Sequence, residues 1–396
     1  MSVWSSLVGQ DAAVAQLSEA AVGARAIIAG RGGGRASDEA RSMSHAWLIT
    51  GPPGSGRSVA ARAFAAALQC TGEEPGCGAC PGCRTTMART NADVVFAATE
   101  TSIINVDTAR SLVLQAQSAP SQGLWRVIVV EDADRLGESG ANALLKAIEE
   151  PPAHTVWLLC APSPEDMIAT IRSRCRHLGL RIPTAAAVAD LLVREGVATP
   201  DVALEAARAA QSHIGLARAL ARDPQMRERR RAIITAPASV RSVGEAVMAA
   251  DRLLETAKAQ ADAQVSERNA REKAEMMRQL GMDEGENATK ASRTMIRQLE
   301  EDQKRRSKRA LTDAIDRALI DLLAIYRDVL MVQVGGDGEL INTDLSDLVH
   351  EIAQDSTPRQ TLARVDHIET ARKRLVSNGN PLLVLEDMAI SLRPQA

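Results

Sequence analysis

The sequence predicts an α/β module with a mostly parallel sheet, followed by an all-helical C-terminal half. In residues 1–180, short apolar segments alternate with segments of helical period. This alternation is typical of a parallel sheet with helices on both faces. After about residue 180 the strand-like segments stop, while helical patterns continue. A chain of 396 residues is long enough for two or three domains.

The α/β part is expected to contain four buried strands with helices between them. The strand segments are "HAWLIT", "ADVVFAAT", "WRVIVVED" and "HTVWLLCA". The helical segments run from Gly9 to Gly30 and over "SVAARAFAAALQC", "NVDTARSLVLQAQ" and "SGANALLKAIEEPP". We expect Asp107 to cap the third helix. The Pro151–Pro152 pair should end the fourth, because proline cannot continue a helix interior. Residues 30–44 and the Gly/Pro-rich "TGEEPGCGACPGC" are expected to be loops.

The helical half divides further by composition. We expect domains at residues 1–180, 181–232 and 233–396, with a highly charged insertion at 258–309. That insertion should form exposed helical arms around a "GMDEGENA" turn; a basic contact to DNA or to a partner is the alternative. After it, an apolar stripe at helical spacing should face a core or a partner helix. The stripe consists of Leu311, Ile315, Leu319, Leu322, Tyr326 and Val329.

Composition limits the classes of protein that fit. The net charge of −3 gives no global attraction to nucleic acid or to an acidic membrane, so such a contact needs a local patch. The N-terminal residues lack a secretory pattern, and the longest apolar runs are interrupted by charges. We therefore expect a cytoplasmic protein without a membrane span, where clustered cysteines indicate metal before disulfides.

The segment "GPPGSGRS" differs by one residue from the phosphate-loop pattern G-x-x-x-x-G-K-[ST]. It lies between an expected strand and an expected helix, where backbone N–H groups can converge on phosphates. Ser58 could bind magnesium, but Arg57 replaces the lysine with a longer, forked cation. A Gly/Pro-rich turn is the alternative. The candidate nucleotide-binding residues of this segment are Gly51, Pro52, Pro53, Gly54, Ser55, Gly56, Arg57 and Ser58.

The strand segment "WRVIVVED" ends in two acids, Glu131 and Asp132. In phosphate-loop ATPases such a strand ends in an Asp that orders magnesium, and a Glu often follows it. Here the order is reversed, so the second carboxylate is about one methylene, roughly 1.5 Å, too short. An error of about 1 Å can cost on the order of a hundredfold in rate. Charged residues that simply close a strand are the alternative.

Four of the six cysteines are clustered in a C-x6-C-x2-C-x2-C pattern: Cys70, Cys77, Cys80 and Cys83. Four thiolates suit a tetrahedral structural zinc ion, with no open position for catalysis. Free cysteines are the alternative. Cys160 lies in an apolar strand and is expected in the core.

These motifs, in this order, resemble the clamp-loader branch of the AAA+ ATPases, and within it the delta-prime type of bacterial DNA polymerase III. The resemblance covers roughly residues 1–220 and rests on six segments. These are "VGQ", "HAWLITGPPGSGRS", the four-cysteine segment, "ANALLKAIEEPP", "SRC" at Ser173–Cys175 and "GLARAL" at Gly215–Leu220.

The resemblance implies an AAA+ P-loop module, a small helical lid and a helical collar that joins a hetero-pentameric ring. It implies partners: tau/gamma motor subunits, a delta subunit, a sliding clamp and primer–template DNA. It makes Arg174 of "SRC" an arginine finger that reaches a neighbour's ATP, and Arg218 the second sensor of a degenerate nucleotide site. Ala161 and Pro162 stand where motor subunits place a polar sensor.

Three losses in its own site, with "SRC" intact, favour a stator that does not hydrolyse ATP. Structural zinc is then the expected cofactor, and ATP with Mg²⁺ in its own site is doubtful. Two alternatives remain. The chain could be an ATP-hydrolysing motor subunit or related DNA-remodelling ATPase, or a zinc-bearing adaptor with a vestigial loop.

Overall fold

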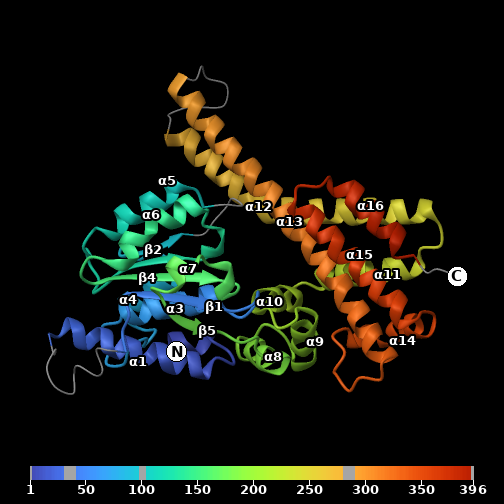
Figure 1. The fold of residues 1–396 in the computed structure, drawn as a ribbon, viewed down its shortest axis with the longest axis horizontal. Coiled ribbons are helices and arrows are strands. Elements are labelled where there is room, and N and C mark those ends of the chain that lie inside the picture. Colours follow the sequence, from blue (N-terminus) through green and yellow to red (C-terminus); the bar gives the residue numbers. More distant parts are fainter. Residues whose placement is uncertain (1, 31–41, 98–103, 280–289, 394–396) are drawn as a thin grey trace. The chain divides into compact units, whose positions relative to one another are not determined.

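The computed structural model describes residues 2–30, 42–97, 104–279 and 290–393. The chain divides into two compact units, Met1–Ala221 and Arg222–Ala396 (Figure 1). The expected boundaries near residues 180 and 232 are finer than this division and stay predictions. Among the described residues, no helix is both long and apolar enough to cross a membrane.

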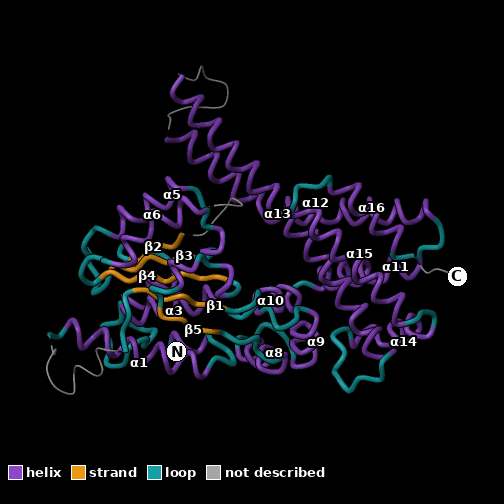
Figure 2. The backbone as a smooth tube through the Cα atoms, in the orientation of Figure 1, coloured by secondary structure: helices purple, strands orange, loops and turns teal. Residues whose placement is uncertain are grey.

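The N-terminal unit is built on a five-stranded sheet in which every pairing is parallel (Figure 2). The strand order is β2-β3-β4-β1-β5. The strands are β1 Ala46–Thr50, β2 Val94–Ala97, β3 Arg126–Val130, β4 Thr155–Ala161 and β5 Arg176–Gly179. Because β1 lies between β4 and β5, the segment that follows it leaves from inside the sheet rather than from its edge.

Helices cover both faces of this sheet, which makes three layers. Along β1, Trp47 and Ile49 face the core formed with α1 (Asp11–Ile28) and α3 (Arg57–Leu68), while Ala46 and Leu48 face the opposite core. The opposite core contains side chains of α5 (Val106–Ala116), α6 (Glu138–Glu149) and α7 (Ala169–Arg172). This alternation is the period-two pattern of a strand buried on both sides.

The four expected strands are confirmed as β1 to β4, but the sequence pattern missed β5. β5 has only four residues, "RHLG", and lies at the edge of the sheet, where it pairs with β1 alone. Its side chains therefore need not all be apolar, and the apolar signal that revealed the other strands is weak.

Two details of the expected helices are wrong. Asn105, not Asp107, caps α5: its Oδ1 accepts a hydrogen bond from the Thr108 N–H at 2.8 Å, and Asp107 lies inside the first turn. The cysteine-rich segment is not entirely loop, because its last residues begin α4 (Pro81–Met87). Pro81 suits the first turn of a helix, where its missing N–H leaves no bond unmade.

Three short helices complete the N-terminal unit, as the sequence predicts: α8 (Ala185–Arg194), α9 (Pro200–Ala209) and α10 (Ile214–Arg222). The C-terminal unit is all-helical. Its helices are α11 Pro224–Ser239, α12 Val243–Gln279, α13 Lys290–Gln333, α14 Ser346–Gln354, α15 Pro358–Val376 and α16 Pro381–Ser391. The predicted stripe on α13 is buried in the core of this unit from Ile315 to Val329, and Leu311 packs against that core partly buried.

The charged insertion forms a two-helix arm from the distal part of α12 and the proximal part of α13 (Figure 1). Most of its side chains are exposed, as expected, but one face of each helix packs against the other through Ala261, Val265 and Ala310. Further out, Arg306 donates to Asn269 and Glu272 at 2.7 and 2.9 Å. The expected "GMDEGENA" turn lies outside the described residues.

A buried carboxylate fixes the loop that precedes β3. Asp93 is fully buried, and its two oxygens accept hydrogen bonds from Ser121, Gln122 and Gly123 at 2.5 to 2.9 Å. Burial alone would raise its pKa, but these hydrogen bonds hold the pKa of Asp93 below its ordinary value. A carboxylate is thus needed to satisfy several N–H groups at once.

We expect Asp93→Asn to lower the free energy of unfolding at pH 7 by about 2 kcal/mol, because an amide accepts these hydrogen bonds less well than a charged carboxylate does. The stabilisation is present above the unfolded pKa of about 3.9 and is lost as the pH falls through the lower folded pKa. Urea unfolding followed by tryptophan fluorescence at pH 7 and in acid measures it.

The matched control is Asp107→Asn, which removes a carboxylate whose side chain is 84% exposed. Its effect should stay within about 0.5 kcal/mol. Equal effects of the two substitutions at pH 7 would contradict the role given to Asp93.

Candidate functional site

The segment Gly51–Ser58 turns from β1 into α3, as the sequence predicts. Gly54 and Gly56 both have φ of 91°, in the left-handed region that glycine adopts without strain. The turn is also held by its neighbours: Gly51 N–H donates to the Pro162 carbonyl at 3.2 Å, and Leu180 N–H donates to the Thr50 carbonyl at 2.7 Å. The loop therefore has the backbone of a phosphate-binding turn without any ligand.

Arg57 points back into this turn. Its guanidinium donates a hydrogen bond to the Gly51 carbonyl. A lysine has one compact ammonium at this position, whereas the guanidinium is a planar fork of five donors. In this structure the cation that would face outer phosphates is bound to the loop's own backbone.

Gln10, the last residue of "VGQ", joins the loop to the segment after β5. It is 4% exposed, and its amide nitrogen donates to the carbonyls of Ser55 at 3.2 Å and Arg181 at 2.6 Å. Its Oε1 accepts from the Arg181 N–H at 3.2 Å. One side chain thus binds backbone groups of two residues far apart in sequence, Ser55 and Arg181, so Gln10 helps to position the loop.

The turn between α9 and α10 lies against the loop. A Cβ placed on Gly54 would come within 2.9 Å of the His213 Cα, which leaves no room for a side chain there. The loop is therefore in close contact with the segment at His213. A separate contact lies at the end of β1, where Thr50 Oγ1 and His177 Nε2 are 2.6 Å apart and share a hydrogen bond.

The acids at the end of β3 lie among arginines. Glu131 accepts from Arg89 at 2.5 Å, and its side chain is 14% exposed. Burial lowers the pKa of Arg62, and nearby Arg89 lowers it further while Glu131 opposes the shift. Glu131 is thus neutralised by a protein cation, and a carboxylate bound to Arg89 has fewer free lone pairs for a metal–water shell.

Burial shifts the pKa of two groups near these acids. Burial raises the pKa of the Cys160 thiol to about 12, and the negative Glu131 adds to the shift. Burial also raises the pKa of Asp134, with a contribution from Asp132. Cys160 is in the core of β4, as expected, and in this environment its thiol stays protonated at neutral pH.

The second-sensor candidate lies on α10 and faces α8. Arg218 forms a two-pronged ion pair with Glu195, with N–O distances of 2.8 and 2.9 Å. Its side chain is 31% exposed. The sequence did not predict Glu195 as its partner.

Arg174 follows α7 and lies on the surface of the N-terminal unit. It forms an ion pair with Glu149 at the end of α6, and its Nη1 donates to the Thr170 carbonyl at 2.7 Å. Its side chain is 38% exposed. Exposed ion pairs contribute little, so Glu149 orients this guanidinium without preventing it from binding another anion.

The four predicted cysteines are brought together. Their sulfur atoms all lie within 4.8 Å of one another. The Sγ atoms of Cys70 and Cys77 are 3.6 Å apart, and those of Cys70 and Cys80 are 3.8 Å apart. Tetrahedral zinc with Zn–S bonds of about 2.3 Å requires sulfurs about 3.8 Å apart, so the spacing fits that ion.

Hydrogen bonds favour the thiolate at Cys80, whereas burial raises the pKa of the Cys83 thiol above its ordinary value. The Cys80 N–H lies 3.4 Å from the Cys77 sulfur, and the Cys83 N–H lies 3.4 Å from the Cys80 sulfur. Burial would raise the pKa of the Cys80 thiol, but hydrogen bonds involving Cys83 and Thr71 hold it at about 6. N–H groups directed at sulfur favour the thiolate, which is the form that binds metal.

The cysteine cluster is attached to the rest of the unit on two sides. The N-terminal residues contact it: Val3 N–H donates to the Gly76 carbonyl at 2.9 Å, and the Trp4 ring N–H donates to the Pro75 carbonyl at 3.2 Å. From α1, Arg25 donates to the Cys70 carbonyl at 3.1 Å. The cluster is therefore part of the folded unit.

Sequence reasoning found the loop, the acids, the cysteines and Arg174, but it missed the residues that contact them. These are Arg89, Glu149, His177, Glu195 and His213. Each comes from another element, and no motif marks it. Gln10 was noted within "VGQ", but its contacts with Ser55 and Arg181 were not predicted.

The N-terminal unit thus has the arrangement of an AAA+ module: a five-stranded parallel sheet flanked by helices, a phosphate-type loop after the inner strand β1, acids after β3 and three following helices. A helical region follows this module in the chain.

Comparison with known proteins agrees with this class. The sequence model of a family described as "DNA polymerase III, delta subunit" matches residues 35–184. The delta' subunit of DNA polymerase III from Escherichia coli K12 is 36% identical over 191 residues, which are 47% of this chain and 57% of that protein. The gamma/tau subunit from Mycobacterium tuberculosis H37Rv is 33% identical over 205 residues, 50% of this chain and 32% of that protein.

Among solved structures, a DNA polymerase III gamma subunit-related protein from Thermotoga maritima matches 88% of this chain and 93% of its own chain. The TM-score is 0.42 and the identity 15%. The N-terminal part of the chain is thus similar to clamp-loader subunits of DNA polymerase III. The matched residues span less than two thirds of the delta' and gamma/tau relatives.

Proposed function

We propose that this protein is a delta-prime-like stator of a DNA polymerase III clamp loader: it holds the ring together and does not hydrolyse ATP itself. The observation that carries the proposal is the state of its own nucleotide loop. Arg57 is bound to the Gly51 carbonyl, and Glu131 is bound to Arg89. An ATP-hydrolysing relative needs a cation for the outer phosphates and a free acid near magnesium.

The residues that remain favour a role in trans. Arg174 is on the surface, exposed and oriented by Glu149. An arginine supplied to a neighbour's ATP neutralises charge that develops on the transferred phosphoryl group. In this proposal the neighbour is a tau/gamma motor subunit, and the complete ring also contains a delta subunit, engages a sliding clamp and acts on primer–template DNA.

We also propose that the four cysteines hold one structural zinc ion. The sulfur spacing suits tetrahedral coordination, and four protein ligands leave no position for substrate. When bound, zinc would cross-link the end of α3 to the start of α4. It would take no part in a chemical step.

The purified chain is expected to hydrolyse ATP negligibly. Arg57→Lys should restore the compact cation and tighten ATP binding, yet leave turnover absent because Glu131 remains paired with Arg89. A coupled phosphate-release assay and equilibrium binding of a fluorescent ATP analogue measure the two quantities. Arg84→Lys, an exposed position on α4, is the matched control and should change neither. Multiple turnovers at about 1 per second or faster by the unmodified chain would reject the stator in favour of a motor subunit.

In a ring reconstituted with its motor subunits, Arg174→Ala should leave assembly intact and lower ATP turnover at the one site that Arg174 faces by about a thousandfold. The reason is the loss of positive charge at the transition state. Clamp- and DNA-stimulated ATPase, with assembly followed by size-exclusion chromatography, measures the effect. Arg172→Ala, an exposed arginine at the end of α7 two residues before Arg174, should retain the full rate. Equal rates for the two variants would remove Arg174 from this role.

Metal analysis of reduced, freshly purified protein should find about one zinc per chain. Cys77→Ser should lower that ratio and the thermal midpoint together, because zinc links segments of the folded unit. Cys175→Ser, outside the cluster, should keep the metal. A zinc-free preparation that unfolds at the same temperature as the zinc-bound one would contradict a structural ion.

A further inference from the structure

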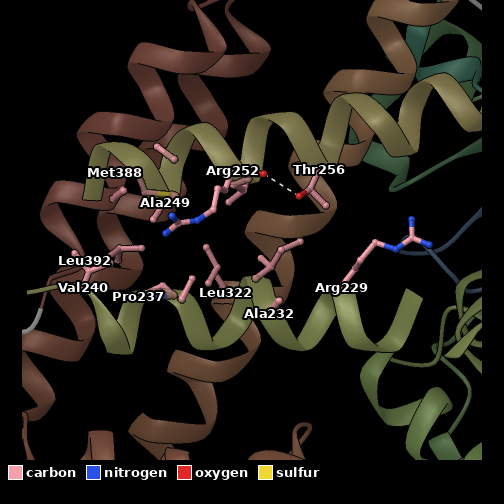
Figure 3. Close-up of a pocket in the computed structure, with 15 residues that line it drawn as sticks. Arg229, Ala232, Pro237, Val240, Ala249, Arg252, Thr256, Leu322, Met388 and Leu392 are labelled. Atoms are coloured by element: carbon pink, nitrogen blue, oxygen red, sulfur yellow. Dashed lines mark hydrogen bonds between the residues drawn. The ribbon is translucent and has the colours of Figure 1, made fainter. Parts of the chain in front are cut away.

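The helix α12 has two parts with different surroundings. Its first turns lie in the body of the C-terminal unit, where Ala249, Ala250 and Leu253 line an apolar cavity together with residues of α11 and α16 (Figure 3). Its distal part extends beyond α15 and α16 and, with the proximal part of α13, forms the two-helix arm (Figure 1). The functions proposed above do not involve this arm.

The two-helix arm is the basic part of an otherwise acidic chain. Residues 258–309 contain 13 Lys and Arg against 10 Asp and Glu, a net charge of +3, whereas the remaining residues contain 34 and 40, a net charge of −6. The excess is concentrated in residues 290–309, which have 8 Lys and Arg against 3 Asp and Glu. Such a local patch is what a chain of negative net charge needs in order to bind a polyanion.

Ion pairs use most acids of the arm and leave several cations over. Arg293, Lys304 and Lys308 have no acidic partner among the described residues. The acids that have no cationic partner there are Asp262 and Glu275. The other acids of the two described helices are each paired with an Arg or Lys of the arm: Glu267, Glu272, Glu300, Glu301 and Asp302.

Four cations form a basic stripe along one face of α13: Arg293, Arg297, Lys304 and Lys308. Their intervals of 4, 7 and 4 residues keep them within about 60° of one another around a helix of roughly 3.6 residues per turn. All four side chains are exposed, and the basic stripe spans roughly 22 Å along the helix. Lys308 also donates to Asn378 Oδ1 at 3.0 Å, but that neutral group does not compensate its charge.

Two acids lie beside the basic stripe, and both are already bound. Glu301 is 3.2 Å from Arg297, whose side chain is 81% exposed, so this pair is weak and its arginine can exchange to another anion. Glu300 is 3.5 Å from Lys273 of α12, which brings a fifth cation to the same side of the arm.

The two unpaired acids are on α12, and only one faces this side. Asp262 is eleven residues, or about three turns, before Lys273 and therefore shares its face near the base of the arm. Glu275 is two residues after Lys273, about 200° around the helix, and faces away. The side with the basic stripe therefore has five cations against three acids.

The two helices of the arm are held together by residues outside the basic stripe. Ala261, Val265 and Ala310 pack against one another, and Gln303 Nε2 donates to the Asn269 carbonyl at 2.9 Å. The basic stripe therefore lies on a firm support, and its side chains can be replaced without loss of the contacts that form the arm.

The composition of the arm favours duplex DNA over other polyanions. Residues 258–309 contain no Phe, Trp or Tyr, so they offer no platform on which unpaired bases could stack. Among the described residues of the arm, Met295 is the one exposed large apolar side chain. Membrane-surface helices and protein hot spots need several. A straight row of cations instead suits a stiff polymer with one negative charge per about 1.7 Å.

We propose that the basic stripe of the two-helix arm binds the phosphate backbone of duplex DNA without reading its sequence. Arginine and lysine contacts to phosphates position a protein on a duplex and carry no base information. Because each contact releases counterions, the affinity falls steeply as salt rises. The contact belongs to this chain alone and uses no residue of the nucleotide loop, so it stands or falls independently of the stator proposal.

The test is a titration of a fluorescein-labelled duplex of 30 base pairs with the full chain, followed by anisotropy. We expect binding at about 50 mM salt. A plot of log K against log salt concentration should have a slope of about −3.6, as for four neutralised phosphates. Duplexes of unrelated sequence should bind within about twofold of one another, and a single strand of the same length should bind more weakly.

A triple variant removes three cations of the basic stripe: Arg293→Ala, Lys304→Ala and Lys308→Ala. It should weaken binding at least about tenfold and make the salt slope shallower by about 2.7, since three of four phosphate contacts are lost. The matched control changes the net charge equally at three exposed helix positions of the same unit outside the arm: Arg252→Ala, Arg359→Ala and Lys373→Ala. It should bind within about twofold of the unmodified chain. Far-UV circular dichroism should give both variants the helix content of the unmodified chain.

Four results would overturn the proposal. The first is no binding of duplex at about 50 mM salt, and the second is an equal loss of affinity in the two triple variants, which would be a general effect of charge. The third is tighter binding of the single strand than of the duplex. The fourth is equal binding of anionic lipid vesicles or polyglutamate, lost in the stripe variant, which would make the site one for any polyanion.

Discussion

The parallel sheet, with β1 between β4 and β5, is the constraint on which the candidate site depends. Parallel strands bring their carboxyl ends to one edge, so the loop after β1 must meet the acids after β3 and the end of β4. The backbone bonds from Gly51 to Pro162 and from Leu180 to Thr50 then fix the loop to both neighbouring strands. The course of the loop is therefore set by the sheet and by these backbone hydrogen bonds.

At that edge, arginine in place of lysine at position 57 keeps the positive charge but changes which groups the side chain can reach. A lysine ammonium has three donors at a single point, whereas Arg57 has a fork long enough to return to the Gly51 carbonyl. Arg89 forms an ion pair with Glu131, with an N–O distance of 2.5 Å. Both Arg57 and Glu131 are therefore bound to groups of the same unit, Arg57 to a carbonyl and Glu131 to an arginine. The pair of Arg174 and Glu149 differs in its acid: the Glu149 side chain is 41% exposed and that of Glu131 14%, so solvent screens the Arg174 pair more strongly.

Much of the fold could be predicted because buried parallel strands are nearly continuous apolar runs, and β1 to β4 have that signature. β5 could not be predicted in this way. It is an edge strand that pairs on one side only, so it tolerates polar residues such as Arg176 and His177 and lacks an apolar run. The cysteine cluster was predictable, since ligands two residues apart converge by local geometry alone. Arg89 was not predictable as the partner of Glu131, 42 residues away. Such a contact is set by tertiary packing, and no sequence spacing encodes it.

One chain of contacts connects the cysteines to the acidic strand end. Cys83 lies on α4, which ends at Met87, and the following turn places Arg89 at a φ of 59° with its N–H bonded to the Thr86 carbonyl at 3.0 Å. A left-handed arginine is uncommon, and it is tolerated where the surrounding structure determines the turn. Cys80 caps the start of α4, α4 leads into this turn, and Arg89 in the turn pairs with Glu131, so a continuous path of local contacts joins the cysteine cluster to the end of β3.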